Sequence, residues 1–194
     1  MTALTSLCVY CGSSSRARPV FLDAARRLGG LIAGAGVELV YGGGRLGLMG
    51  HVADGALAAG GHVVGIIPEH LHRVEIRHEG LQELLIVDTM HERKTAMFRR
   101  ADAFCVLPGG MGTLDEMVEI LTWRQLALHD LPVVIVNQDG FFEPFRALMD
   151  HFIAENFAGA AIRDYLTWVD TVDDVLPALA GLPDPVAEEH PERM

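Results

Sequence analysis

Short apolar runs alternate with helical segments along almost the whole chain, and this alternation constrains the fold more than any other feature. The expected strands are SLCVYCG, VELVYGG, HVVGIIP, ELLIVDT, AFCVLPG, PVVIVNQ and a short LTWVD. Most of them are apolar without a clean two-residue alternation, which is typical of parallel strands covered on both faces. The sequence therefore predicts an α/β fold with a doubly wound, mostly parallel sheet of about seven strands and helices on both faces.

The segments between these strands have helical patterns. We expect helices at 19–33, 48–59, 91–101, 113–128, 142–155 and 171–179. No linker or internal repeat interrupts the pattern, so residues 1–180 are expected to form a single nucleotide-binding domain. The tail 181–194 is rich in Pro and Glu and is expected to be flexible.

Charge and apolar content exclude several classes of partner. The 194 residues carry a formal net charge of -11, which argues against nucleic acid or an anionic membrane as the main partner. No apolar stretch approaches the roughly 20 residues that span a bilayer, and the N-terminus lacks the basic region of a signal peptide. We therefore expect a protein of the cytoplasm.

The three cysteines are Cys8, Cys11 and Cys105, an odd number in apolar, strand-like surroundings that suit a reducing compartment. Cys8 and Cys11 have the spacing of a redox motif, but such motifs normally lie at a helix start. Here the pair falls within a strand, where positions three apart point to opposite faces. We expect all three to be buried and without a catalytic role.

Polar or glycine-rich residues follow four of the expected strands. The strand ends read CGSSS, YGGGRLGLMG, DTMHERK and LPGGMGT. Ligands of open α/β sheets bind at the carboxyl ends of the strands, so these four ends predict a site of nucleotide size.

The first glycine loop, Gly42-x-Gly44-x-x-Gly47, formally matches the dinucleotide-binding fingerprint, with Glu69 at a suitable distance for a ribose hydroxyl. The same pattern also serves any tight turn from strand to helix, and a dehydrogenase would leave the second glycine loop without a role. Neither loop ends in the Lys-Ser/Thr of a Walker A motif.

The second glycine loop, Pro108 to Thr113, also follows a strand and begins a helix. Glycines allow close approach of a ligand to the backbone, and free N–H groups at a helix start favour phosphate. Thr113 and Glu116 have the spacing of a capping box, with Thr113 as N-cap. Glu116 is therefore either a cap or a functional carboxylate beside a phosphate site.

Arg93 and Lys94 lie in the first turn of an expected helix, where the helix dipole disfavours cations. Either the negative charge of a ligand compensates for them, or they form a solvated face. The segment 69–79, EHLHRVEIRHE, has no compact metal-site spacing, and we expect a polar loop over the site. Metal contact by His70 and His72 stays open as an alternative.

Taken together, these residues resemble the LONELY GUY (LOG) family of cytokinin riboside 5'-monophosphate phosphoribohydrolases, whose bacterial members are often labelled lysine decarboxylases. The family motif P-G-G-x-G-T-x-x-E is matched at every fixed position from Pro108 to Glu116. CGSS, YGGG, GLMG, MHERK and LTW are further landmarks, and the resemblance runs from about Cys8 to about Asn156.

The resemblance implies a homodimer of Rossmann-like subunits with sites near the interface. It implies hydrolysis of the N-glycosidic bond of a nucleoside 5'-monophosphate, with Arg93 and Glu116 as the catalytic pair. We expect the reaction to need no cofactor and no metal. The substrate-binding residues implied by matching positions are Glu75, Arg93, Lys94, Gly109, Gly110, Met111, Gly112, Thr113, Leu114, Asp115, Glu116 and Thr122. From the landmarks at the other strand ends we add Met90, Gly12, Ser13, Gly43 and Gly44.

Two questions stay open at this level. A Rossmann-like carrier of a nucleotide or pterin-type cofactor would share the glycine loops without performing hydrolysis. The substituent on N6 of the base, isopentenyl or none, does not follow from the sequence. Nothing in the sequence favours pyridoxal phosphate, so the decarboxylase label gains no support from it.

Overall fold

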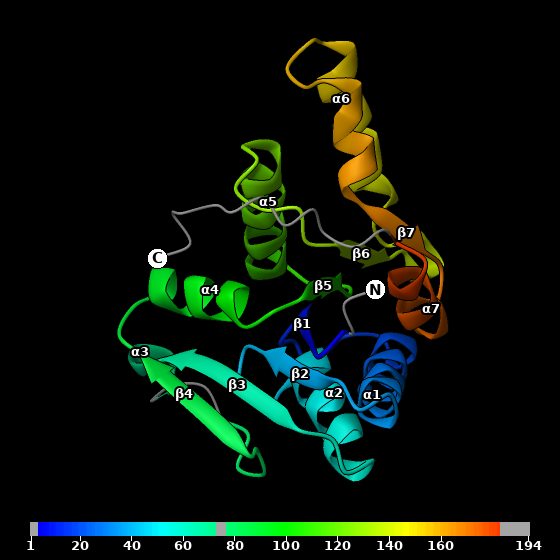
Figure 1. Cartoon of the computed structure of the whole chain (residues 1–194). Coiled ribbons are helices and arrows are strands. Elements are labelled where there is room, and N and C mark those ends of the chain that lie inside the picture. Colours follow the sequence, from blue (N-terminus) through cyan, green and yellow to red (C-terminus); the bar gives the residue numbers. More distant parts are fainter. Residues whose placement is uncertain (1–3, 73–76, 183–194) are drawn as a thin grey trace.

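Seven strands form one sheet in the computed structural model, which describes residues 4–72 and 77–182. All neighbouring strands are parallel, in the order β4-β3-β2-β1-β5-β6-β7 (Figure 1). The strands are β1 (Ser6–Tyr10), β2 (Glu38–Tyr41), β3 (Val63–Pro68), β4 (Glu83–Val87), β5 (Ala103–Val106), β6 (Val133–Val136) and β7 (Thr167–Val169). The central strands are buried along their length, which confirms the predicted parallel sheet.

Helices cover both faces of the sheet, as predicted (Figure 1). Apolar side chains of α1, α2 and α7 share one core with one face, and those of α4, α5 and α6 share a second core with the other. The bounds are α1 (Pro19–Gly34), α2 (Gly47–Ala58), α3 (Glu69–His72), α4 (Met90–Arg99), α5 (Met111–Gln125), α6 (Glu143–Ala154) and α7 (Val175–Ala180).

The direction of strand progression reverses between β1 and β5. From β1 the chain builds outward through β2, β3 and β4, and it then returns to place β5 on the other side of β1. Tyr10 is level with Val106 across this central pair, so both strands end at the same edge. Open α/β sheets bind ligands at such a switch point, and here it joins the loops that begin at Cys11 and Leu107.

Side-chain alternation along β1 separates the two cysteines of the Cys-x-x-Cys sequence. Cys8 lies in the core beneath α4 and α5, whereas Cys11 lies in the core beneath α1 and α2. Both are buried and free, as is Cys105. The predicted placement on opposite faces is confirmed.

Several local features differ from the sequence expectation. Helix α5 begins at Met111, two residues before the expected start, and the last expected helix is a short 3-10 turn followed by α7. The turn of helix α3 and a 3-10 helix at Ala160–Tyr165 were not expected, because segments this short carry no hydrophobic periodicity. Among the described residues, no helix is long and apolar enough to cross a membrane.

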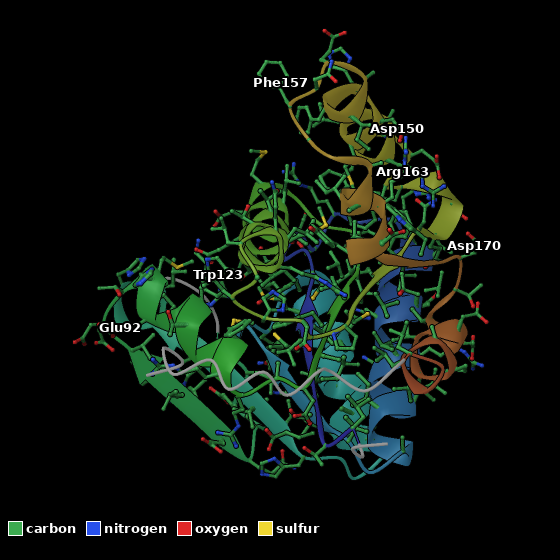
Figure 2. All side chains as sticks on the ribbon, turned by 45° about the horizontal axis from the view of Figure 1, so that its top comes forward. Glu92, Trp123, Asp150, Phe157, Arg163 and Asp170 are labelled. Carbon is green, nitrogen blue, oxygen red and sulfur yellow. The ribbon has the colours of Figure 1, made fainter. Side chains whose placement is uncertain are left out.

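Helix α6 and the segment after it extend away from the sheet (Figure 1). We call residues 143–165 the arm. Figure 2 shows Asp150 and Arg163 along the arm and Phe157 at its far end; Arg163 Nη2 lies 2.7 Å from Asp150 Oδ1. Phe157 is 85% exposed, so the arm presents apolar surface far from the core.

Candidate active site

The side chains of Arg93 and Glu116 meet in the interior between α4 and α5. Arg93 Nη1 donates a hydrogen bond to Glu116 Oε1 at 2.5 Å, and only 10% and 8% of the two side chains are exposed. Arg93 Nε donates to the carbonyl of Ile66, near the end of β3, at 3.0 Å. Residues of β3 and α5 thus hold the guanidinium of an α4 residue, and the predicted catalytic pair is in direct contact.

Glu116 does not cap α5, so the capping-box alternative offered by the sequence is wrong. Because α5 starts at Met111 with Gly110 as N-cap, Thr113 is the third helical residue and Glu116 the sixth. The Thr113 hydroxyl instead packs so closely on Gly109 that a β-carbon at Gly109 would overlap it. Packing on the glycine, rather than capping, therefore fixes Thr113, and Glu116 turns to Arg93.

The neighbouring helix α4 carries the cap that the sequence suggested for α5. Thr89 is its N-cap, and the Thr89 hydroxyl accepts a hydrogen bond from the Glu92 amide at 3.1 Å. The Glu92 carboxylate accepts from the backbone N–H of Asp88 at 3.0 Å. This exchange secures the helix start that positions Arg93.

Carboxylates of α5 compensate the two cations near the start of α4. Lys94 Nζ lies 3.0 Å from Asp115 Oδ2 and 3.3 Å from Glu119 Oε2. Partial burial would lower the pKa of Lys94, but these two carboxylates outweigh it and raise the pKa. Because Glu116 likewise neutralises Arg93, the protein itself supplies the compensating negative charge, which neither of the two alternatives drawn from the sequence had foreseen.

Burial dominates the electrostatics of Glu116. Removal from water raises the pKa of its carboxyl group, and the Arg93 guanidinium opposes that rise. The thiol of Cys8 lies near enough for the Glu116 charge to raise its own pKa further, beyond the rise that burial causes. Glu116 therefore lies beside a thiol that stays un-ionised, in surroundings of low dielectric where the charge of the carboxylate acts strongly.

The two glycine loops differ in whether the helix that follows has an open N-terminus. The carbonyl of Gly12 accepts hydrogen bonds from the amides of Leu48 and Met49, at 2.9 and 3.3 Å, so protein backbone occupies the start of α2. A side chain at Gly47 would collide with the backbone of Ser13 and Ser14, which leaves this turn closely filled. The dinucleotide fingerprint therefore serves here as a tight turn.

The start of α5 is open by contrast. The first intrahelical donor is the Leu114 amide, which bonds the Gly110 carbonyl at 3.0 Å, so the amides of Met111, Gly112 and Thr113 precede the helical ladder. Gly110 and Gly112 are exposed. Of the two helix starts that follow glycine loops, α5 has the geometry for an anion.

The loop after β1 supports the loop after β5. The Gly12 amide donates to the Pro108 carbonyl at 3.1 Å, and a β-carbon at Gly12 would lie 3.1 Å from the Gly109 α-carbon. Ser13 follows on the exposed side of this contact. The switch point thus brings residues 12 and 109 together, as the sequence predicted.

The remaining predicted residues occupy more varied places. Met90 is partly buried as the first residue of α4, and exposed Thr122 lies farther along α5, where its hydroxyl donates to the carbonyl of Val118 at 2.8 Å. Gly43 and Gly44 are buried beneath residues 77 and 78. Glu75 lies outside the described residues. Contact of these positions with substrate stays a prediction.

Sequence reasoning missed two residues that shape the Arg93 site. A β-carbon at Gly42 would overlap Arg93 Nη2 and lie 3.0 Å from Met49 Sδ, so the guanidinium packs directly on Gly42. The run of three glycines in YGGG could have suggested such a close approach. Nothing in the sequence indicated Ile66, because its contribution is a backbone carbonyl.

Within the described part of the chain, no group of three or more His, Cys, Asp or Glu side chains could hold a metal ion. His70 is exposed, and the side chain of His72 is not among those described.

Comparison with known proteins places this site in a family. A family model described as possible lysine decarboxylase matches residues 49–179. The chain is 46% identical over 170 residues to a protein of Oryza sativa subsp. japonica named probable cytokinin riboside 5'-monophosphate phosphoribohydrolase LOGL1, covering 88% of this chain and 76% of that protein. It is 43% identical over 157 residues to the phosphoribohydrolase LOG2 of Arabidopsis thaliana, covering 81% and 74%.

Solved structures with the same fold include molybdenum cofactor proteins. The molybdenum cofactor binding protein of Rippkaea orientalis has a TM-score of 0.69 at 22% identity, covering 93% of this chain and 98% of that one. The carrier protein MCP of Chlamydomonas reinhardtii has a TM-score of 0.70 at 20% identity, covering 92% and 97%. At such identities the likeness shows the fold alone, whereas the closer sequence matches show that this chain belongs to the LONELY GUY family of cytokinin riboside 5'-monophosphate phosphoribohydrolases.

Proposed function

We propose that the protein hydrolyses the N-glycosidic bond of adenosine 5'-monophosphate-type nucleotides, releasing the free base and ribose 5-phosphate. The observation that carries this proposal is the buried Arg93–Glu116 pair beside the open N-terminus of α5. An anion site and a buried carboxylate lie on the same helix, within its first two turns. A nucleotide that is negative at its phosphate and becomes positive at its sugar during cleavage is complementary to this arrangement.

The 5'-phosphate is proposed to bind the α5 amides of Met111, Gly112 and Thr113. The ribose then lies along the first turns of the helix, near Glu116. Cleavage of the bond between C1' and the base builds oxocarbenium-like charge on the sugar, which a carboxylate stabilises. Glu116 also orients the attacking water and accepts its proton.

Arg93 is proposed to keep the buried Glu116 in its ionised form. Burial alone favours the protonated acid, and a protonated Glu116 could neither stabilise a cation nor activate water. The hydrogen bond from Arg93 Nη1 also fixes the carboxylate orientation. The hydroxyl of the water is added to C1', and the proton that Glu116 accepts ends on the departing base, so the overall reaction consumes one water.

A lysine-dependent decarboxylase is disfavoured by the state of Lys94, the only lysine in the chain. A Schiff base with pyridoxal phosphate needs an unprotonated lysine amine. Lys94 is ion-paired with Asp115 and Glu119, and its pKa is raised. It is therefore held as a cation and is a poor nucleophile.

The carrier alternative shares the fold with the molybdenum cofactor proteins but gives no role to the Arg93–Glu116 pair. Incubation of the protein with AMP, followed by chromatography for adenine and ribose 5-phosphate, distinguishes the two. We expect release of adenine from AMP and little from adenosine, because the phosphate supplies the positioning energy. Binding of AMP without cleavage would favour the carrier, and comparable turnover of adenosine would remove the phosphate role of α5.

The preferred N6 substituent is open to the same assay. Steady-state comparison of AMP with N6-isopentenyl AMP determines which nucleotide the site favours. We further propose that the protein acts as a homodimer in the cytoplasm. Exposed apolar side chains near the end of α5 and on the arm support a second copy as partner, and three free, buried thiols support a reducing compartment.

A further inference from the structure

His78 is a buried histidine in an otherwise exposed turn. It is 8% exposed, whereas Arg77, Glu79 and Gly80 are exposed. Its Nδ1 accepts a hydrogen bond from the Gly80 amide at 3.2 Å, so the ring proton lies on Nε2. Nε2 donates to Asp54 Oδ1, on α2, at 2.9 Å. Both ring nitrogens are used, and the side chain joins the turn to α2.

The backbone around His78 joins the same turn to the first glycine loop. The His78 amide donates to the Gly43 carbonyl at 3.2 Å, and Arg77 pairs with Gly44 in an isolated antiparallel bridge. The imidazole therefore fixes residues 77 and 78, whose backbone holds Gly43 and Gly44 directly and so restrains the loop 42–44. The far side of that loop is also confined, because a β-carbon at Gly43 would lie 3.3 Å from Ile67 Cβ.

The clamped loop forms one wall of the Arg93 site. Gly42 packs against the Arg93 guanidinium so closely that no side chain fits between them. Ile66 and Glu116 hold the guanidinium through hydrogen bonds, whereas Gly42 restrains it only by contact. A shift of the loop would therefore let Arg93 move relative to Glu116.

We propose that the Asp54–His78 pair is a positioning element for Arg93, acting through the glycine loop 42–44. This inference rests on the proposed hydrolase function, because Arg93 matters to rate only if Glu116 is catalytic. His78 makes its described contacts to the loop and to α2, so it is a positioning residue and not a catalytic one. The pair secures the geometry of the reacting centre and leaves the phosphate site at α5 untouched.

His78→Ala tests the proposal through a split between kcat and KM. We expect kcat for AMP to fall about tenfold, since small displacements of a catalytic group carry costs of this order, while KM changes less than about twofold. His78→Gln should recover most of the rate, because its amide N–H can still donate to Asp54. Asp54→Ala, which removes the acceptor of the His78 hydrogen bond, should lower kcat as His78→Ala does, and Arg26→Ala is its control because Arg26 also pairs with Asp54, at 3.2 Å.

His129→Ala is the matched control. His129 is also buried. Its Nδ1 accepts a hydrogen bond from the backbone amide of Leu131 at 3.1 Å, and its Nε2 donates to the Ile120 carbonyl at 2.8 Å. It packs on Phe98 in the core that α4, α5 and α6 share with the sheet, whereas His78 bonds α2 on the other face. Equal kcat losses in the His78 and His129 variants at matched thermal stability would overturn the proposal, as would a wild-type rate in His78→Ala.

A measurement without substrate separates this inference from the proposed function. The ¹H–¹⁵N signal of the Arg93 Nε–H group reports its hydrogen bond to Ile66 and is assigned by its loss in Arg93→Lys. We expect this signal to shift or broaden in His78→Ala and to stay in place in His129→Ala. An unmoved signal in both variants would refute the positioning role even if the wild-type enzyme cleaves AMP. A wild-type protein that leaves AMP intact would refute only the hydrolase.

Discussion

At the scale of single residues, the site depends on Glu116 carrying a charge where solvent cannot support it. The carboxylate is buried, with Arg93 as its counter-ion, while Lys94 is paired with two other acids of α5. The acids after the glycine loop therefore have separate tasks. Asp115 and Glu119 neutralise a cation of α4, and Glu116 is left to face the ribose of the proposed substrate.

Replacement of Glu116 by Gln should reduce kcat for AMP by about 10²-fold or more, the usual scale for losing a general base or a key electrostatic partner. AMP should still bind, because the amides of α5 are unchanged. The melting temperature should fall, because Arg93 becomes a buried cation without a counter-ion. Steady-state kinetics, an AMP titration and a thermal melt on one preparation check all three.

Glu92→Gln is the matched control, because Glu92 is the exposed acid that does take part in helix capping. It should leave kcat near the wild-type value. A Glu116→Gln enzyme as active as the Glu92→Gln enzyme would exclude catalysis by the Glu116 carboxylate.

The raised pKa of Glu116 predicts how the activity depends on pH. If the carboxylate must be ionised, activity falls as pH drops through its pKa, which burial places above the usual 4.5. In Arg93→Gln the opposing cation is lost, so the acid limb should move to higher pH. The measurement is kcat at saturating AMP, because kcat/KM also reports the substrate phosphate, whose second pKa is about 6. An acid limb that lies at the same pH in both enzymes would argue against Glu116 as the titrating group.

At the scale of elements, side-chain hydrogen bonds link strands at the edge of the sheet opposite the site. Asp102, directly before β5, accepts hydrogen bonds from the Thr5 amide at 2.9 Å, the Thr5 hydroxyl at 2.6 Å and the Ser6 amide at 2.9 Å. Arg100 joins Glu38, at the start of β2, to Glu83, at the start of β4. Side chains therefore fix the starts of four strands, and the open N-terminus of α5 lies at the other edge of the sheet.

Asp102→Asn should lower the melting temperature near neutral pH and have less effect in acid. Burial raises the pKa of Asp102, but the hydrogen bonds from Thr5 and Ser6 outweigh it, so the folded pKa lies below the unfolded value. Its stabilisation is therefore present above the unfolded pKa of about 3.9 and is lost as pH falls through the folded pKa. Thermal melts of both proteins from pH 7 to pH 3 measure the difference.

The exposed residue Asp170, shown in Figure 2, provides the comparison. Asp170→Asn should change the melting temperature little across this range. A difference between wild type and Asp102→Asn that stays constant down to pH 3 would contradict the assigned cause.

At the scale of the whole molecule, the described chain leaves apolar side chains exposed beside the site-bearing helix. From the sequence, the apolar helices around Met97 and Trp123 are expected to supply surface for a dimer. Met97 itself is fully buried and Trp123 packs on Phe98, so other residues of these helices and their neighbours carry the exposed apolar surface. The exposed apolar side chains on this side of the sheet include Met111, Val118, Leu126, Leu128, Leu148, Phe152 and Phe157. They belong to α5, the residues after it and the arm.

If a second copy of the chain covers this surface, Leu126→Asp combined with Phe152→Asp should give a monomer, because two buried charges without partners oppose association. Val20→Asp is the control, since Val20 is similarly exposed, at 39%, but lies on α1 over the other face. Analytical ultracentrifugation at assay concentration measures the oligomeric state. A wild-type protein that sediments as a monomer with full activity would refute the dimer.

The sequence by itself determined the order of strands and helices along the chain and the convergence of glycine loops at one sheet edge. Both follow from local periodicity and from motif residues close together in the chain, whereas the pairing of Arg93 with Glu116 was implied only by the resemblance to a family. Tertiary structure decided where α5 begins, which helix N-terminus is open, and what balances the α4 cations. Each depends on contacts between residues that are distant in the chain. Arg93, for example, lies 23 positions from Glu116 and 27 from Ile66, and it contacts both. Backbone carbonyls that bind a side chain or fill a helix start leave no trace in residue type, so only the folded chain reveals them.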